Sequence, residues 1–299
     1  MERSVLIFIG GLFAVGMMYI LFATVTTKDK ALAKDLWAIF LTEFAIAGLI
    51  IGPSLLGRWA LAIVITLLGL LALREFYLVT CPKQIPLLKW SGLVAATIIF
   101  VAAYILDSVV DFYGLIFLMG GLFLIIYIFL PVSTDVPRQL GLTFNGLLYP
   151  CLCLAHLLLI AEYPQGLALV IFIYCVLETN DSFALVTGKW LGRHKIFPKL
   201  SPNKTISGIL GGGIAALVVA ILLSIFIFDF TWHISLFGTL IIIIFAIIGD
   251  LVASKFKRDM NVKDFGNVLP KQGGVLDIYD SLIFVAPVFY GFLQIFQTG

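Results

Sequence analysis

Long apolar runs alternate with short polar segments along almost the whole chain of 299 residues. A helix that crosses the hydrocarbon core of a membrane needs about 20 mostly apolar residues. The apolar runs are continuous rather than alternating, which favours helices over a barrel. They predict ten membrane-spanning helices, at about residues 4–26, 37–52, 59–79, 90–106, 112–131, 144–162, 167–186, 206–228, 234–253 and 281–297. The second run is short and carries Glu43, so nine spans are the alternative.

The composition supports the same class of protein and excludes others. Hydrophobic residues make up 62% of the chain and charged residues 12%, with a mean hydropathy of +1.13. Soluble domains average ~45–50% apolar and ~25% charged residues, so a water-soluble globular enzyme is excluded. A net charge of +2 provides no basic surface for nucleic acid, and no nucleic-acid partner is expected. We therefore expect an all-α polytopic membrane protein, with one integral membrane domain over 1–299.

The distribution of Lys and Arg predicts the orientation of these helices. Cytoplasmic loops of membrane proteins carry an excess of Lys and Arg. Of the 19 such residues, all but Arg3 and Arg58 lie in one alternating set of loops. That set comprises residues 27–36, 74–89, 132–143, 187–205 and 254–280. We expect these loops in the cytoplasm and both termini outside, with the first apolar run retained as a helix rather than cleaved as a signal peptide.

Charged residues concentrate in two of these polar regions. The stretches 178–205 and 249–281 hold ten of the 19 cationic residues and seven of the 17 acidic residues. Each stretch adjoins apolar runs, and ionisable groups at a membrane boundary are functional by default. The sequence therefore predicts a polar site on the cytoplasmic side, built from these two stretches.

The acidic residues of the second stretch have a spacing that suits phosphate chemistry. Helical periodicity places Asp250 and Lys257 on one helix face, and it places Asp277 and Asp280 together at the start of the last span. Carboxylates provide the oxygen ligands that Mg²⁺ prefers, and the ion usually shares its shell with substrate phosphates. Lys and Arg neutralise the remaining phosphate charge.

Glycines and turn residues add a second group of candidates. Gly273 and Gly274 precede the Asp277 segment, where free backbone N–H groups would cradle an anion; a simple turn is the alternative. Ser201 and Pro202 indicate a turn and a helix start, which would put Lys204 at the positive end of a helix. By contrast, three consecutive glycines at 211–213 indicate close helix packing rather than a phosphate loop.

Two motifs in these stretches resemble the signature of phosphatidate cytidylyltransferases, also called CDP-diacylglycerol synthases. The resemblance is specific over about residues 175–290 and only hydropathic before that. The downstream motif comprises Ser254-Lys255-Phe256-Lys257-Arg258, Lys263-Asp264, Leu269-Pro270, Gly273-Gly274, Asp277 and Asp280. The upstream motif comprises Asn180-Asp181-Ser182, Gly188-Lys189, Gly192, Lys195, Pro198-Lys199, Ser201-Pro202, Lys204-Thr205 and Gly208.

The resemblance implies an integral membrane enzyme that makes CDP-diacylglycerol and pyrophosphate from CTP and phosphatidate. It implies Mg²⁺, and a second cation as an option, at a cytoplasm-facing site in a bacterial inner membrane, contact with membrane lipids, and a homodimer. The hydrophobic helices would occupy 1–165, and the catalytic helices and loops 166–299. By motif match, the metal ligands would be Asp250 and Asp277. The catalytic residues would be Lys257, Arg258, Lys263, Asp264 and Asp280, and the substrate-binding residues Asp181, Ser201, Lys204, Thr205, Gly273 and Gly274.

Three polar positions depart from the family pattern. Gln272 stands where the family commonly has histidine, Ile278 where it has arginine, and Ser207 where a glutamate is usual. The chain is therefore expected to be a divergent member. Activation of another lipid or isoprenoid phosphate by CTP is the nearest alternative. An ion-coupled transporter is less consistent, because transport sites lie near the bilayer midplane rather than at its boundary. A catalytically inactive paralogue is the remaining alternative.

Overall fold

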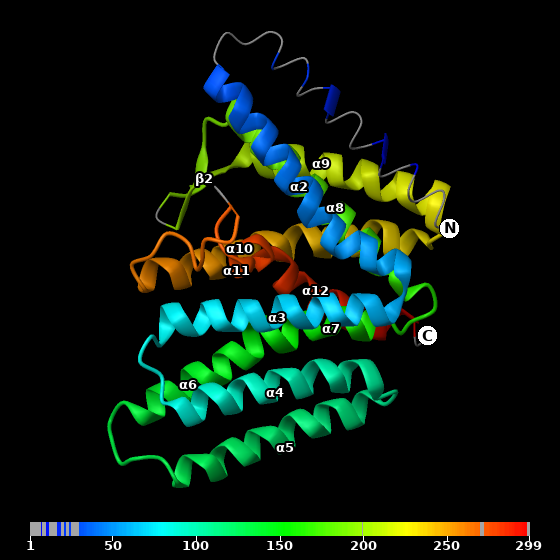
Figure 1. Cartoon of the computed structure of the whole chain (residues 1–299). Coiled ribbons are helices and arrows are strands. Elements are labelled where there is room, and N and C mark those ends of the chain that lie inside the picture. The colour runs from blue at the N-terminus through cyan, green and yellow to red at the C-terminus, as the bar shows by residue number, and fades with distance from the viewer. Residues whose placement is uncertain are drawn as a thin grey trace.

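A computed structural model describes residues 30–198, 200–269 and 272–297, with scattered positions before residue 30. Within these ranges the protein is a bundle of helices that run roughly side by side, with one short hairpin of strands (Figure 1). Most of the predicted span at 4–26 and the motif residues Lys199 and Pro270 lie outside the described residues, as does Lys271. The elements are α2 (Lys30–Leu56), α3 (Arg58–Thr80), α4 (Pro86–Ile105), α5 (Val109–Ile128), α6 (Val136–Gly146), the π-helical η1 (Leu147–Leu152), α7 (Cys153–Ile160), α8 (Gly166–Leu191), β1 (Lys195–Phe197), β2 (Ser201–Thr205), α9 (Ile206–Leu223), η2 (Ser224–Phe228), η3 (Ile234–Gly238), α10 (Thr239–Asp259), α11 (Val275–Ile278) and α12 (Asp280–Gln297).

The described helices confirm an all-α polytopic membrane protein. Seven of them are long and apolar enough to cross a membrane, and two shorter apolar helices occupy Phe40–Leu56 and Asp280–Phe296. Together they correspond to the second to tenth predicted spans. The sixth span begins earlier than predicted, at Val136 rather than 144, because α6, η1 and α7 form one continuous helix.

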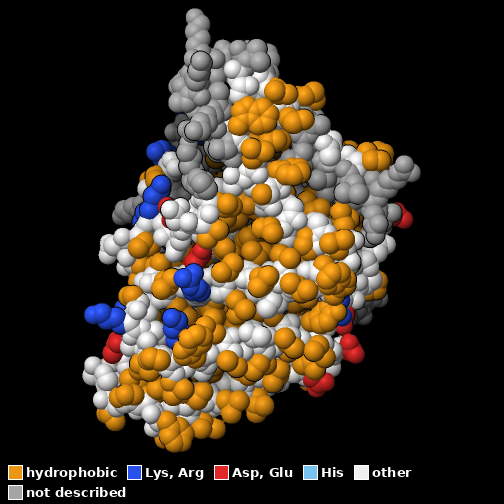
Figure 2. Space-filling view, in the orientation of Figure 1, with side chains coloured by type: hydrophobic (Ala, Val, Ile, Leu, Met, Phe, Trp, Pro, Cys, Tyr) orange, Lys and Arg blue, Asp and Glu red, His pale blue; other side chains and the backbone are white. Residues whose placement is uncertain are grey.

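Hydrophobic side chains cover most of the face seen in Figure 2, and charged side chains lie mainly toward its two sides. Lys and Arg are mostly on the side of the β hairpin and the α10–α11 connection (Figures 1 and 2). A wide apolar band between polar ends is the surface that a bilayer requires. The hairpin and this connection therefore belong to one end of the bundle.

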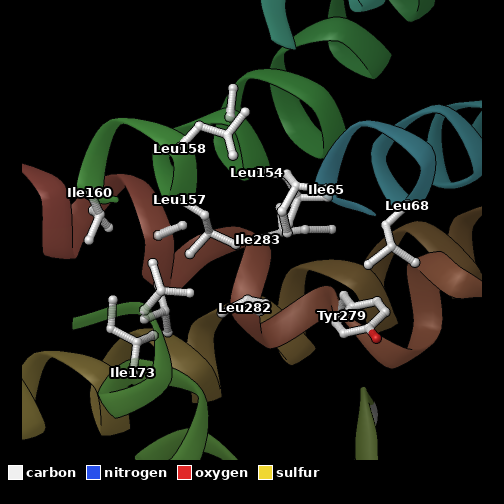
Figure 3. Packing of buried hydrophobic residues seen from close by; sticks show 14 of the residues in the cluster. Ile65, Leu68, Leu154, Leu157, Leu158, Ile160, Ile173, Tyr279, Leu282 and Ile283 are labelled. Carbon is white, nitrogen blue, oxygen red and sulfur yellow. The ribbon is translucent and has the colours of Figure 1, made fainter. Parts of the chain in front are cut away.

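The helices pack around one continuous hydrophobic core. α8 packs along α9, α10 along α12, and α12 against α7, while α11 contacts α3. Figure 3 shows where α3, α7 and α12 meet, with Ile65, Leu154, Leu157 and Ile283 among the buried side chains. The core crosses the expected boundary at 165/166 without a break. The N-terminal helices therefore support the elements that carry both motifs.

Two of the three glycines at 211–213, Gly211 and Gly212, lie in the close contact between α8 and α9, which agrees with the predicted helix packing. A Cβ atom built on Gly211 would lie 2.4 Å from the Thr187 Oγ1 atom. One built on Gly212 would lie 2.4 Å from the Asn180 carbonyl oxygen, which is part of the helix backbone. By contrast, a Cβ on Gly213 would meet nothing closer than 3.8 Å.

We expect Gly212→Ala to destabilise the protein and Gly213→Ala to be nearly neutral. The first methyl group would force α8 and α9 apart, at a cost of about 1–3 kcal/mol. Thermal unfolding of both variants in the same detergent measures the difference. Equal midpoints for the two variants would contradict the close packing at Gly212.

Two predicted helix starts are wrong in detail. The segment Ser201–Thr205 forms β2, which pairs antiparallel with β1, and α9 begins only at Ile206. Thr205 is the N-cap residue, because its Oγ1 accepts the Gly208 N–H at 3.1 Å. Asp277 and Asp280 also do not share one helix, since Tyr279 separates the short α11 from α12.

Candidate active site

A cavity of about 680 Å³ lies where α8, β2, α9, α10, α11 and α12 converge. Its lining combines apolar side chains with ten charged ones, six of them carboxylates and four of them lysines. The charged side chains are Glu178, Asp181, Asp250, Asp264, Asp277, Asp280, Lys189, Lys195, Lys204 and Lys257. The fold thus brings the two predicted polar stretches together in one pocket.

Asp250 lies on α10 and joins it to the β hairpin. Its Oδ2 forms an ion pair with the Lys204 Nζ at 2.7 Å, and the Ser254 hydroxyl donates to its Oδ1 at 3.4 Å. Both charged side chains are partly exposed, with relative accessibilities of 31% for Asp250 and 20% for Lys204. Lys204 therefore reaches the pocket from β2 rather than from a helix end, which corrects the predicted placement.

Asp277 organises the segment between α10 and α12. Its Oδ2 accepts backbone N–H groups from Phe265 at 2.7 Å, Gly274 at 3.0 Å and Gly266 at 3.4 Å. Its Oδ1 pairs with the Lys257 Nζ at 2.8 Å, and only 4% of the Asp277 side chain is exposed. One carboxylate thus ties α10, the following loop and α11 together.

Gly273 and Gly274 pack against the carboxylate of Asp277. The Gly274 N–H, which was predicted to cradle a substrate anion, donates to Asp277. Gly273 has φ +91°, and a Cβ there would lie 2.7 Å from the Asp277 Oδ2. Only glycine combines this backbone conformation with such a close approach.

Asp280 is a buried carboxylate that lines the same pocket as the two lysine–aspartate pairs. It is the first residue of α12 and only 7% exposed. Its carboxylate interacts electrostatically with Asp250, Lys257, Asp181 and Asp277. The Ser281 hydroxyl donates to its Oδ1 at 3.3 Å. A buried carboxylate near three others is costly unless cations compensate it.

The remaining predicted residues divide into two groups. Asp181, Ser201, Thr205 and Asp264 line the pocket. Arg258 and Lys263 are exposed and are not part of the lining. The structure therefore brings together most of the predicted set but leaves these two cations at the surface.

Several polar residues near the pocket are absent from the predicted site residues; the sequence singled out Gln272 and Glu43 but assigned neither of them to the site. Gln272 lines the pocket and donates to Glu43 on α2 at 2.7 Å, and Glu43 also hydrogen-bonds Glu178. Tyr279 is buried, and its hydroxyl has no hydrogen-bond partner among the described residues. Burial raises the pKa of Tyr279, so this hydroxyl stays protonated at neutral pH. Glu75 contacts the loop from α3. Glu43 and Glu75 are acidic residues inside apolar runs, and this feature of the sequence could have identified them.

The pocket's donor set suits a divalent cation that shares its shell with phosphates. Its lining has an excess of two carboxylates over lysines, and Asp250 and Asp277 each already hold one ammonium group in place. Among the described residues, no group of three or more acidic, His or Cys side chains forms a cage that could hold an ion by itself. Mg²⁺ commonly takes only one or two carboxylates and completes its shell with water and phosphate. The residues present therefore fit this ion when a phosphate substrate is bound.

Fold and pocket together define a class: an integral membrane protein with a site of paired lysines and carboxylates at one end of its helices. The model of the family described as "Cytidylyltransferase family" matches residues 36–296, and the chain belongs to this family. It is 32% identical over 252 residues to a phosphatidate cytidylyltransferase of Bacillus subtilis (strain 168), covering 81% of this chain and 92% of that protein.

Two staphylococcal proteins match over a shorter region. The phosphatidate cytidylyltransferase of Staphylococcus saprophyticus is 42% identical over 125 residues, which cover 42% of this chain and 48% of that protein. The protein of the same name from Staphylococcus haemolyticus is 42% identical over 129 residues, or 43% of this chain and 50% of that protein. These matches confirm the family that the two motifs indicated.

Proposed function

We propose that this protein transfers CMP from CTP to phosphatidate and forms CDP-diacylglycerol and pyrophosphate. The observation that carries the proposal is the convergence of the Lys204–Asp250 and Lys257–Asp277 pairs on one pocket. The chain also aligns with 92% of a protein named for this activity. Lys204 and Lys257 both line this pocket, so an anionic substrate bound there would contact them.

The reaction makes one bond between phosphorus and oxygen and breaks another. An oxygen of the phosphatidate phosphate attacks the α-phosphorus of CTP, and pyrophosphate leaves with the electron pair of the broken bond. The attacking oxygen is already anionic, so no strong general base is needed. The protein must hold the nucleophile and leaving group in line and neutralise the charge between them.

The residues of the pocket have distinct tasks in this proposal. Lys204 and Lys257 donate to phosphate oxygens. The carboxylates of Asp250 and Asp277 would hold Mg²⁺. The bound ion would stabilise negative charge on the phosphates. Asp280 lies within electrostatic reach of Lys257 and supports the position of its ammonium group. Apolar side chains in the lining, including Leu185 and Ile209, offer a surface for the acyl chains.

We also propose that the pocket faces the cytoplasm. The β hairpin and the α10–α11 connection lie in two of the loops rich in Lys and Arg, and the positive-inside rule places such loops in the cytoplasm. Asn203, on β2, lines the pocket and is exposed, so it is a suitable site for an introduced cysteine. We expect an impermeant maleimide to label Asn203→Cys only after cells are opened. Labelling in intact cells would contradict this orientation. The homodimer implied by the family stays a prediction.

Transfer of label from CTP into lipid tests the proposed substrate. Purified protein is given CTP labelled in the α-phosphate, first with phosphatidate and then with a polyprenyl phosphate. We expect labelled CDP-diacylglycerol with phosphatidate. The second candidate is another lipid phosphate, because Gln272 and Ile278, two positions that depart from the family pattern, both line the pocket. Label in the polyprenyl product alone would favour that candidate.

A further inference from the structure

Glu75 is a buried carboxylate that holds the loop before α12 from the opposite side of the core. It lies on α3, is 6% exposed, and belongs to the N-terminal half of the chain. Its Oε1 accepts the Val275 N–H at 3.0 Å and its Oε2 accepts the Leu276 N–H at 2.8 Å. Both oxygens therefore hold the first turn of α11, 200 residues further along the chain.

Two glycines of the same loop are packed against this carboxylate. A Cβ on Gly274 would lie 2.4 Å from the Glu75 Oε2, and one on Gly266 would lie 2.6 Å from its Oε1. The same two residues donate their N–H groups to Asp277. The loop backbone is thus held between two carboxylates, Glu75 on one side and Asp277 on the other.

The geometry points to Glu75 as a positioning residue for the reaction. We propose that its carboxylate fixes the backbone at Gly266 and over residues 274–276, so that Asp277 keeps its Oδ1 toward Lys257 and the pocket. This inference rests on the proposed function, because it assigns Asp277 and Lys257 to that site. Glu75 itself does not line the pocket, so it acts through the loop rather than on the substrate.

Hydrophobic packing alone would not need a carboxylate at this position. Among the described residues Glu75 has no ion pair, so its buried charge is balanced mainly by the two N–H groups. Burying a charge in this way is costly. A glutamine of the same shape would accept only one N–H and would turn its own NH₂ group toward the other. The site therefore requires both oxygens.

Glu75→Gln and Glu75→Asp test this inference in the full-length protein. Gln139→Ala is the matched control, because Gln139 is 7% exposed, its Oε1 accepts the Ile85 N–H at 2.8 Å, and neither residue lines the pocket. The measurements are kcat, KM for CTP, the thermal midpoint, and hydrogen–deuterium exchange. Exchange reports local opening of the loop without any reference to activity.

We expect Glu75→Gln to lower kcat by about 100-fold with little change in KM, since a small misplacement of catalytic groups acts mainly on turnover. Exchange should rise in peptides over 265–279 and stay unchanged over α5. Glu75→Asp keeps both oxygens on a shorter side chain and should be intermediate. Gln139→Ala should lose a comparable amount of thermal stability and keep its kcat.

Two results would overturn the inference. One is a kcat for Glu75→Gln within about threefold of the wild-type value. The other is a loss of activity with exchange raised throughout the bundle rather than in 265–279. If Glu75→Gln does not fold, Glu75→Asp is judged by the same criteria. Absence of cytidylyltransferase activity in the wild type would reject the proposed function instead, and the exchange measurement would still test the loop.

Discussion

Asp277→Asn is expected to lower turnover by about 1,000-fold or more, the largest effect of any single substitution in the pocket. Asp277 accepts three backbone N–H groups on one oxygen and the Lys257 ammonium group on the other. An asparagine has only one acceptor oxygen, so its NH₂ group must face either Lys257 or the loop backbone. Initial rates of CMP transfer measure the loss, and thermal unfolding shows how much of the loop's stability goes with it.

Asp277 contacts both Lys257 and the loop backbone, so a control variant should remove only one of these two contacts. Lys257→Met removes the ammonium group and leaves the three backbone contacts to Asp277 intact. This variant should retain the thermal midpoint better than Asp277→Asn does, while also losing activity. Wild-type turnover in Asp277→Asn would show that this carboxylate has no part in the reaction.

Asp250→Asn is expected to have the second largest effect, a fall in turnover of about 100-fold to 1,000-fold. The substitution removes the charge that holds Lys204 at 2.7 Å, and it removes one of the two carboxylates proposed to bind Mg²⁺. Within the part of the chain that the structure describes, no backbone N–H donates to Asp250 as three do to Asp277, so the fold should be little affected. A raised requirement for Mg²⁺ should accompany the loss.

Asp259→Asn is the matched control for Asp250→Asn. Asp259 lies on the same helix, α10, and also pairs with a lysine, Lys255, but both side chains are exposed. Exposed pairs of this kind contribute little to stability, so this variant should resemble the wild type in rate and in unfolding temperature. Equal losses in the two variants would mean that helix charge, rather than the pocket, controls turnover.

The sequence predicted the site best where the charged residues lie on a single helix, because their spacing then shows which of them share a face. The i, i+7 relation of Asp250 and Lys257 placed both on the pocket face of α10. The apolar runs located most of the described spans to within about six residues, and the exception is the start of the sixth span. The distribution of Lys and Arg also agreed with the end at which the hairpin and loops gather (Figure 1).

Contacts between distant elements could not be derived in the same way. The partner of Asp250 is Lys204 on β2, and the pairing depends on how α9 and α10 pack rather than on any local pattern. Strand pairing with β1 also overrode the helix start indicated by Ser201 and Pro202. Glu75 lay inside the predicted span 59–79 and was given no role, although an acidic residue near the end of an apolar run was a signal for it.

The central claim is that this pocket joins CMP from CTP to the phosphate of phosphatidate. The most direct measurement gives purified wild-type protein and Asp250→Asn phosphatidate, Mg²⁺ and CTP labelled in either the α- or the γ-phosphate. We predict that the α label enters the lipid extract as CDP-diacylglycerol and the γ label is released as pyrophosphate in equal amount, with both strongly reduced in the variant. Lipid-linked α label no higher in the wild type than in Asp250→Asn would contradict the account.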